Sequence, residues 1–478
     1  MIRRTSEAQP AGNCRDLSRS ASEGRGRGGA DRVRGRPEAE QLSVSGVCDS
    51  RRVISIERGL LEGLDEVDWA ELGHAYGRAQ DVPEQLTELC GDDEVAREGA
   101  MTSLFGNIFH QGTRYSASPH AVPFLARIAL AGPHAVRDRV LTLLTRLAID
   151  WHDEYDLPGG IEIEAWRAAV AAVSLDEALA FYDEQIAAEP DEGKRNRIRD
   201  IRAEWAAGRL MDSRASALLS YGAVRAELSG LLSLLDDPDP VIRTRTAYLS
   251  AWFPEEAAAV LPRLLDRLRV EDSVTVTATT LVAVGLLGDI TLRAQLGPHL
   301  DASAPLVRWA AATALARVGS AEDTGLGSEL TGRVISELTA AAADPPKPDV
   351  DYNEGDIPGY TSRSLLSLAD HGRETVIRGV ADCLPAMPRH HTEWTARTAL
   401  AVAFTESFRD RTPSFVELTE AQQRLLQALA KAEVWNAYGK KFEEGLRSRR
   451  LPDTGAALRH YVGLPDDGQD DTADCIWA

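Results

Sequence analysis

Apolar residues recur at helical spacing along most of the chain, and short polar breaks separate the periodic runs. In the clearest example, Leu231, Leu234 and Leu235 form one apolar face, and the break Asp-Asp-Pro-Asp-Pro at 236–240 follows. Proline fits the first turn of a helix, because the N–H groups of that turn have no partner within the helix. Asp239 can cap the same end and oppose its positive dipole. This pattern predicts two helices joined by a tight turn.

Equivalent helix starts recur at Ile242, Val276 and Val307, which lie 34 and 31 residues apart. Looser copies begin near Ala96 and Val136. The apolar content is mostly Ala, Leu and Val, with only 6% aromatic residues, which favours close-packed helices over a sheet. Helix pairs of this length cannot bury their apolar faces alone, so successive pairs must stack. The sequence therefore predicts an all-α fold, an α-solenoid of helical hairpins.

Two stretches carry a resemblance to a known repeat. They are "DPDPVIR" at 237–243 and "SAPLVRWAAATALARVG" at 303–319, and they resemble the short bacterial HEAT repeats called HEAT-like repeats of phycobilisome lyases. The stretch "DWAELGHAYGRAQDVPEQL" at 68–86 resembles the N-terminal region of uncharacterised HEAT-repeat proteins from GC-rich bacteria. The repeat likeness covers about 83–320 and implies a right-handed superhelix. It leaves the function open, because HEAT arrays serve as scaffolds, transport receptors, lyases and a few enzymes.

Composition divides the chain into four parts. Residues 1–52 hold eleven Arg among Gly and Ser without periodicity, which predicts a disordered tail. We expect that translation of the protein starts further along the chain than residue 1. The alternative is a basic arm that contacts nucleic acid or a partner. We expect the repeat array over 53–320. Further helices and a C-terminal cap should fill 321–464, interrupted by an acidic, proline-rich loop at 341–360, before an acidic disordered tail at 465–478.

Charge and cysteine content narrow the range of partners. The formal charge is −21, and because residues 1–52 carry +4, the body of the chain carries −25. Such a surface repels phosphate backbones, which argues against nucleic acid. The five cysteines are widely spaced without a C-x-x-C pair, which indicates a reducing cytoplasm. No apolar run approaches the roughly 18 residues of a membrane span, so we expect no membrane contact.

The stretch "FGNIFHQGTRYSASPHAVPFL" at 105–125 gathers polar side chains between two predicted helices. Gly112 should end the first helix and Ser118 should cap the second. The candidate binding residues are His110, Gln111, Arg114, Tyr115 and His120. They form either a polar elbow that satisfies backbone groups, or a binding lip in which Arg114 reaches an acidic group and Tyr115 anchors a partner. Ser116 lacks a nucleophile elbow and no cysteine is near, so we expect no catalytic residue here.

Two acidic stretches raise the question of metal binding. "IDWHDEYDLPGG" at 149–160 is a run of adjacent residues that would point in many directions, as in a solvated loop. "DVDYNEGD" at 349–356 departs from a calcium loop, because its glycine is seventh and Tyr360 replaces the glutamate at position twelve. The His-Glu dipeptides of a HEAT-repeat di-iron hydroxylase are absent from the sequence. We therefore expect no metal and no cofactor.

Charged residues recur at the helix junctions. Arg243 and Arg308 open their predicted helices, while Asp236 and Asp301 close the preceding ones. We expect them to form a ladder of charge-assisted hydrogen bonds between neighbouring units. Pairs that are partly exposed contribute roughly 0–1 kcal/mol each, so the ladder should set register more than stability.

These patterns favour a non-enzymatic scaffold that binds a protein partner through its concave face. An acidic inhibitor or immunity-type protein is the alternative, and its association rate should fall steeply with ionic strength. A HEAT-like lyase or DNA glycosylase has less support. A lyase needs a pigment-bearing partner, and a glycosylase needs a basic groove, for which Trp309 beside Arg308 is the nearest candidate.

Overall fold

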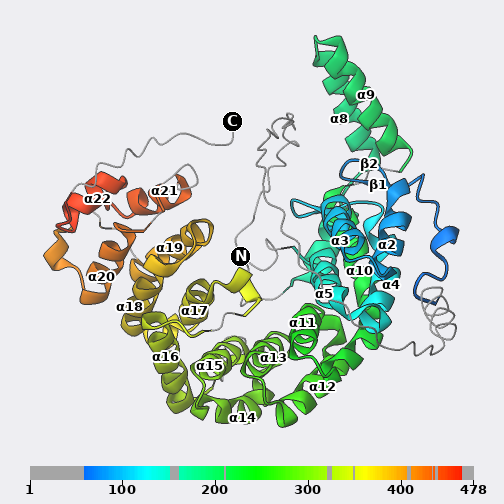
Figure 1. Cartoon of the computed structure of the whole chain (residues 1–478). Helices are drawn as coiled ribbons and strands as arrows, with labels where there is room; N and C mark the ends of the chain where they lie inside the picture. The colour runs from blue at the N-terminus through cyan, green and yellow to red at the C-terminus, as the bar shows by residue number, and fades with distance from the viewer. Residues whose placement is uncertain are drawn as a thin grey trace, which may run out of the picture. The chain divides into compact units, whose positions relative to one another are not determined.

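The computed structural model describes residues 59–150, 161–208, 212–319, 326–347, 350–405, 408, 411–432, 434–435 and 440–465. The expected N-terminal tail at 1–52 and all but the first residue of the expected C-terminal tail at 465–478 lie outside these ranges. The described residues form a body that is mostly helical, with two very small sheets (Figure 1). The predicted all-α class is therefore confirmed.

The helices and strands have the following bounds. The α-helices are α2 (Val82–Cys90), α3 (Glu94–Ile108), α4 (Ser118–Ala131), α5 (His134–Ala148), α7 (Ile163–Ala171), α8 (Leu175–Ala188), α9 (Glu192–Ala206), α10 (Ser213–Leu231), α11 (Pro240–Ser250), α12 (Ala257–Val270), α13 (Val274–Leu287), α14 (Arg293–Leu296), α15 (Pro305–Gly319), α16 (Ser328–Ala343), α17 (Ile357–Leu366), α18 (Arg373–Cys383), α19 (Arg389–Ala403), α20 (Glu420–Leu429), α21 (Lys440–Ser448) and α22 (Gly455–Tyr461). The strands are β1 (Gly73–His74), β2 (Gly77–Arg78), β3 (Phe109–His110) and β4 (Thr113–Arg114). The 3-10 helices are η1 (Leu64–Glu66), η2 (Ala79–Asp81), η3 (Leu232–Asp236), η4 (Pro254–Glu256), η5 (Ile290–Leu292), η6 (Gly297–Asp301), η7 (Tyr352–Gly355), η8 (Ala369–His371), η9 (Leu384–Ala386) and η10 (Phe415–Glu417).

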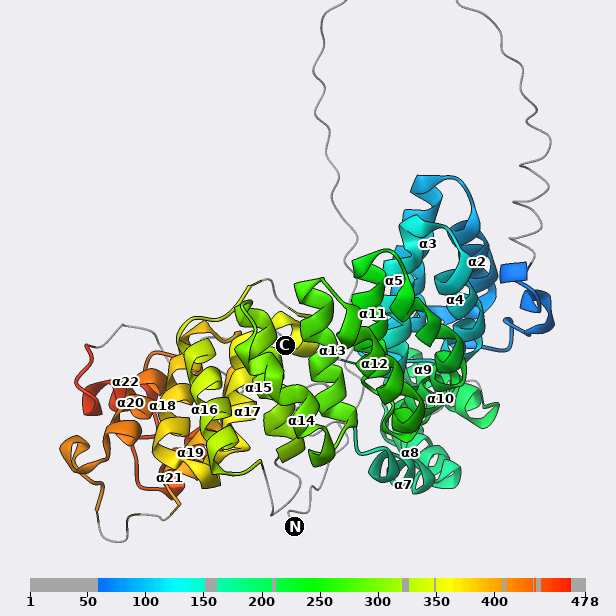
Figure 2. The ribbon, with the colours of Figure 1, turned by 90° about the horizontal axis from the view of Figure 1, so that it is seen from below.

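Most helices alternate between two rows (Figures 1 and 2). Row A holds α2, α4, α10, α12, α16, α18 and α20, and row B holds α3, α5, α11, α13, α15, α17, α19 and α21. Within row B each helix packs on the next member, as α11 does on α13 and α13 on α15. Between the rows many helices pack on their neighbour in the chain, as α12 does on α13 and α17 on α18. Helices of both rows therefore bury apolar side chains against each other.

Local capping explains where the predicted units begin. Asp239 caps α11 by accepting a hydrogen bond from the Val241 N–H, and Pro240 opens the helix, as the sequence predicts. Ser273 plays the same part for α13, and Pro305 opens α15. The side chains at the three equivalent positions Ile242, Val276 and Val307 are all buried.

Helices α13 and α15 approach each other closely at Gly285. A Cβ atom added to Gly285 would lie 2.5 Å from the Cα atom of Ala314, which is too short for any ordinary contact. The facing stretch of α15 is rich in buried alanine, from Ala310 to Ala316. Small side chains on both helices allow this spacing, which is why an Ala-rich run predicts a helix packed on all sides.

Helices α7, α8 and α9 interrupt the alternation between α5 and α10, and the sequence pattern did not predict this insertion. Helix α7 packs on α10, whereas α8 and α9 pack on each other. No residue of α8 or α9 is buried. A contact between the Arg78 guanidinium and the Glu204 carboxylate, 3.4 Å apart, joins α9 to the region of β2.

The stretch Ser213–Asp236, which covers α10 and η3, is long and apolar enough to cross a membrane, by length and composition alone. Its helix packs on α4 and α5, and 44% of the tested window is buried inside the chain. Core helices of ordinary proteins pass the same test, so this stretch is weak evidence for a membrane contact.

Candidate functional site

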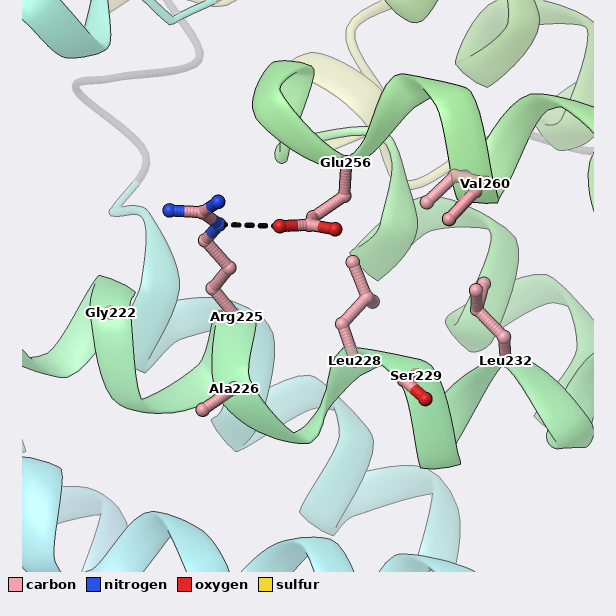
Figure 3. A pocket seen from close by; sticks show the side chains of 9 residues that line it. Gly222, Arg225, Ala226, Leu228, Ser229, Leu232, Glu256 and Val260 are labelled. Atoms are coloured by element: carbon pink, nitrogen blue, oxygen red, sulfur yellow. Dashed lines mark hydrogen bonds and ion pairs between the residues drawn. The ribbon is translucent and has the colours of Figure 1, made fainter.

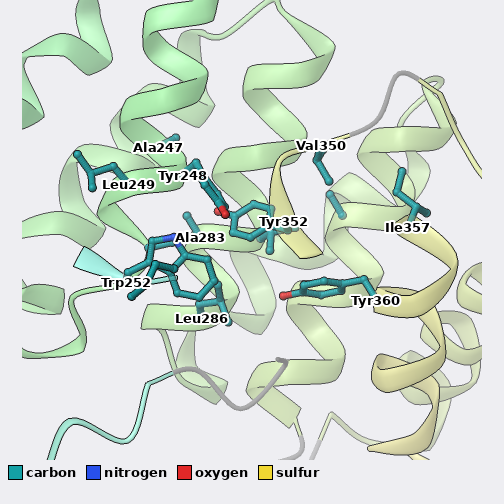
Figure 4. Packing of buried hydrophobic residues seen from close by; sticks show 14 of the residues in the cluster. Ala247, Tyr248, Leu249, Trp252, Ala283, Leu286, Val350, Tyr352, Ile357 and Tyr360 are labelled. Carbon is teal, nitrogen blue, oxygen red and sulfur yellow. The ribbon is translucent and has the colours of Figure 1, made fainter. Parts of the chain in front are cut away.

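Residues 350–356, here called the strap, cross row B and contact helices about a hundred residues earlier in the chain. Tyr352 is fully buried among the rings of Tyr248, Trp252 and Tyr360, with ring centroids 4.9, 5.9 and 6.1 Å away (Figure 4). Its hydroxyl donates a hydrogen bond to the carbonyl of Thr279, at 3.1 Å. The strap therefore ties α11, α13 and α17 together.

The backbone of the strap has an unusual conformation. Asn353, Glu354 and Gly355 have φ angles of 53°, 55° and 79°, all in the left-handed region. Asparagine and glycine enter this region at low cost, but glutamate does so rarely. Such strain persists only where the surroundings fix the chain, and it is concentrated at functional sites.

A buried contact between a carboxylate and an imidazole anchors the end of the strap. Oδ2 of Asp356 lies 2.6 Å from Nδ1 of His391 on α19, and both side chains are 1% exposed. Oδ1 of Asp356 also accepts a hydrogen bond from the N–H of Gly359 and so caps α17. The weak resemblance of 349–356 to a calcium loop thus has a structural explanation: Asp356 holds a histidine and a helix end.

A cavity of about 370 Å³ lies beside the strap, between α5 and α11. Its lining residues are Thr142, Thr145, Arg146, Arg245, Tyr248, Val350, Asp351, Glu354 and Gly355. Nη1 of Arg245 donates to Oδ1 of Asp351 at 2.5 Å. The buried Nε of Arg245 and the buried Oδ2 of Asp351 have no hydrogen-bond partner among the described residues.

That unused donor and unused acceptor make this cavity the strongest candidate for a binding site. Buried polar atoms normally have partners, and the exceptions call for an explanation such as a missing ligand or water. A cavity of this volume is within the range that small ligands and side chains occupy. It is too small for a folded domain.

A second cavity, of about 400 Å³, lies between α10 and α12 in row A (Figure 3). Nε of Arg225 on α10 and Oε1 of Glu256 are 2.7 Å apart on one side of it, so these charges satisfy each other. Much of the remaining lining is small or apolar, including Leu228, Leu232 and Val260. This cavity has less polar chemistry to give a ligand than the cavity beside the strap.

The predicted elbow at 105–125 is a β-hairpin, which corrects two expectations. Helix α3 ends at Ile108, so Gly112 does not end it. Gln111 and Gly112, with φ angles of 50° and 81°, form the two-residue turn between β3 and β4. Ser118 is the first residue of α4 instead of its cap, and its hydroxyl donates to the carbonyl of Ile108.

The candidate residues of the elbow face different neighbours. Arg114 is buried, and its Nη1 donates to Oδ2 of Asp150 at 3.0 Å and to the carbonyl of Gly112 at 2.9 Å. In the binding-lip alternative Arg114 would reach an acidic group of a partner, whereas in the structure its carboxylate partner is Asp150 of the same chain. The ring of His110 lies against that of Tyr76, with centroids 5.3 Å apart.

The remaining candidates do not form a cluster with these residues. Gln111 is exposed at the tip of the turn, Tyr115 is half-buried, and His120 is exposed on α4. Of the acidic run near 150, Asp150 pairs with Arg114, and residues 151–156 lie outside the described ranges. Within those ranges the structure places no group of three or more His, Cys, Asp or Glu side chains that could hold a metal.

A polar network next to the hairpin was missed at the sequence level. Nε2 of His74 lies 2.9 Å from Oδ1 of Asp81, and the Tyr76 N–H donates to Nδ1 of the same ring. Oδ2 of Asp81 accepts hydrogen bonds from Gln85 and Asn107. Because Nδ1 accepts, Nε2 carries the proton and His74 donates to Asp81. The network fixes β1 to α2 and α3.

The expected ladder exists, but its pairing was wrong. Arg243 pairs with Glu271 through two hydrogen bonds of 2.8 and 2.9 Å, not with Asp236. Arg308 pairs with Glu337 at 3.0 Å, not with Asp301. The two aspartates pair with arginines of later row A helices: Asp236 with Arg263 at 2.8 Å and Asp301 with Arg333 at 2.7 Å. Each of these contacts thus links a 3-10 helix or the row B helix after it to the row A helix that follows in the chain.

No family model matches the chain, and no curated protein matches it either. Among solved structures, the chain is similar to one described as an engineered protein, with 16% identity over 84% of this chain and 94% of that chain. The TM-score of this match is 0.28, which is too low to support an argument about fold or function. The evidence for the candidate site therefore comes only from the geometry of this chain.

Proposed function

We propose that this chain is a HEAT-like α-solenoid of the cytoplasm, a right-handed superhelix with row B on its concave face, that binds a protein partner. The packing of each row B helix on the next and the regular ladder between successive units support the repeat architecture. The observation that carries the function is the cavity beside the strap, with its unused buried donor on Arg245 and unused buried acceptor on Asp351.

The chemistry of this cavity suits a short peptide segment of the partner. Every peptide unit has both an N–H donor and a carbonyl acceptor, so one segment can pair with both the arginines and the carboxylates of the lining. Two arginines and two carboxylates line the cavity, which makes it mixed in charge, not a site for a polyanion.

The test compares two matched substitutions. Thr142 lines the cavity on α5 and Thr277 lies on α13; both are half-buried, and each donates to the carbonyl four residues earlier. Thr142→Trp should fill the cavity, whereas Thr277→Trp adds the same bulk to row B outside the cavity lining. Proteins captured from the native lysate with the parent chain would be identified, purified and titrated against all three chains by calorimetry.

We expect Thr142→Trp to weaken binding at least tenfold while Thr277→Trp retains it, with both variants showing a folded circular dichroism spectrum. Equal binding by the two variants would contradict the proposal. A partner peptide that binds the parent chain but not Thr142→Trp would show that a segment suffices.

The net charge of −25 on the body of the chain favours a second candidate, an acidic inhibitor of a basic partner. The same titration distinguishes the two. The association rate of an inhibitor should fall steeply between low and high salt, whereas binding through the mixed-charge cavity should depend weakly on ionic strength.

A further inference from the structure

The helical hairpin α8–α9 lacks the cover that the other long helices have. The two helices contact through the rings of Tyr182 and Trp205, whose centroids are 6.1 Å apart. Two hydrogen bonds of 2.7 and 2.8 Å also join Arg202 to Asp183. Even so, neither helix contains a buried residue. Isolated helices of this length are marginal in water, because most helical stability in proteins comes from packing of an apolar face.

Apolar side chains remain exposed beside this seam. Phe181, the neighbour of Tyr182 in α8, is 48% exposed, and Ile201, one turn before Trp205 in α9, is 38% exposed. Leu175 at the start of α8 is 49% exposed. Three exposed large apolar residues on one short hairpin indicate a surface that another molecule covers.

The charges on the hairpin indicate which molecule that is. Helix α8 contains four acidic and no basic residues, for a net charge of −4. Helix α9 contains five basic and three acidic residues, for a net charge of +2. A surface that carries both signs on adjacent helices is complementary to a copy of itself turned by a two-fold axis, because each acidic helix then meets a basic one.

We propose that two copies of this chain associate through α8–α9 and form an antiparallel four-helix bundle. In this arrangement α8 of each copy lies against α9 of the other, and Phe181 and Ile201 become part of the apolar centre. Helices of this length with an apolar stripe and flanking charges are the usual components of such bundles. The proposal is independent of the cavity beside the strap.

The first experiment measures the molar mass of the full chain by sedimentation velocity across a range of concentrations. We expect a dimer for the parent chain, and at least a hundredfold weaker association for the Phe181→Asp/Ile201→Asp variant. Val416→Asp is the control, because Val416 is 82% exposed outside the hairpin and should leave the dimer intact. A parent chain that stays monomeric at every concentration would overturn the proposal.

Charge reversal provides a second test that does not depend on the apolar residues. Glu177→Lys/Glu184→Lys removes the acidic charge of α8, and Lys194→Glu/Arg197→Glu makes α9 acidic. Each variant alone should associate at least tenfold more weakly than the parent chain. A mixture of the two should recover part of the association, because the basic α9 of the first variant then meets the acidic α8 of the second, while the altered α8 of the first meets the altered α9 of the second. No recovery in the mixture, with both variants folded by circular dichroism, would exclude the two-fold pairing.

Discussion

Arginine side chains hold the turns between helices in an equivalent way in successive units. Nη1 of Arg243 donates to the carbonyls of residues 237 and 238, and Nη1 of Arg308 donates to those of residues 302 and 303. The surroundings of the two arginines differ. The side chains of Arg243 and Glu271 are 9% and 0% exposed, whereas those of Arg308 and Glu337 are 29% and 21% exposed. We therefore expect the two arginines to contribute differently to stability.

We predict that Arg243→Ala destabilises the chain by about 3 kcal/mol, because it leaves the buried carboxylate of Glu271 without its main partner. Arg308→Ala should cost less than about 1 kcal/mol, since its pair is closer to solvent. Urea denaturation followed by circular dichroism measures both values. Equal losses would mean that the exposure of the pair does not set its contribution.

At the scale of elements, the helix starts at Pro240, Val274 and Pro305 follow from local signals, because capping and proline placement depend only on neighbouring residues. The strap could not be derived in this way. Tyr352 reaches Tyr248 only because α11, α13 and α17 are already packed, and no local pattern encodes that distance. Gln111-Gly112 contained only a weak signal, because glycine suits the left-handed second position of a tight hairpin turn, whereas the first position usually holds Asn, Asp or Gly.

The candidate site, too, was predictable from the sequence only in part. Arg114 was singled out as a residue that could reach an acidic group of a partner, but in the structure it contacts Asp150 of the same chain. The cavity residues Arg245 and Asp351 were not predicted, because they are 106 positions apart and nothing near either one marks the other. Sequence periodicity predicts which side chains are buried, whereas a site between elements depends on how those elements meet.

The spacing of α13 and α15 gives a prediction at this scale. Gly285→Ala should destabilise the chain by about 1–3 kcal/mol, because the new methyl group would overlap the backbone of Ala314 and force the helices apart. Gly332→Ala on α16 is the matched control. Its Cβ would meet no atom within 4 Å, so the change should be neutral or stabilise the helix by up to about 1 kcal/mol. Thermal unfolding of the two variants would show opposite shifts; a similar shift for both would contradict close packing as the cause.

At the scale of the whole molecule, acidic side chains link segments that are distant in sequence. Asp237 pairs with Arg137, Glu255 with Arg167 and Arg225, and Glu271 with Arg243. For all three carboxylates, burial alone would raise the pKa, but hydrogen bonds and the nearby guanidinium groups outweigh it and hold the pKa below its usual value. Folding therefore favours their ionised form.

The sign of the pH dependence follows from these lowered pKa values. A carboxyl group with a lower pKa in the folded state stabilises the fold fully above its unfolded pKa, and this contribution is lost as the pH falls through the folded pKa. Stability should thus decrease below about pH 4.5. Glu271→Gln should be less stable than the parent chain at neutral pH and should lose less of its stability on acidification. Glu329→Gln, which removes an exposed carboxylate, should follow the parent curve. Denaturant unfolding at a series of pH values measures all three, and parallel curves for the parent chain and Glu271→Gln would show that this ion pair does not contribute to the acid sensitivity of the array.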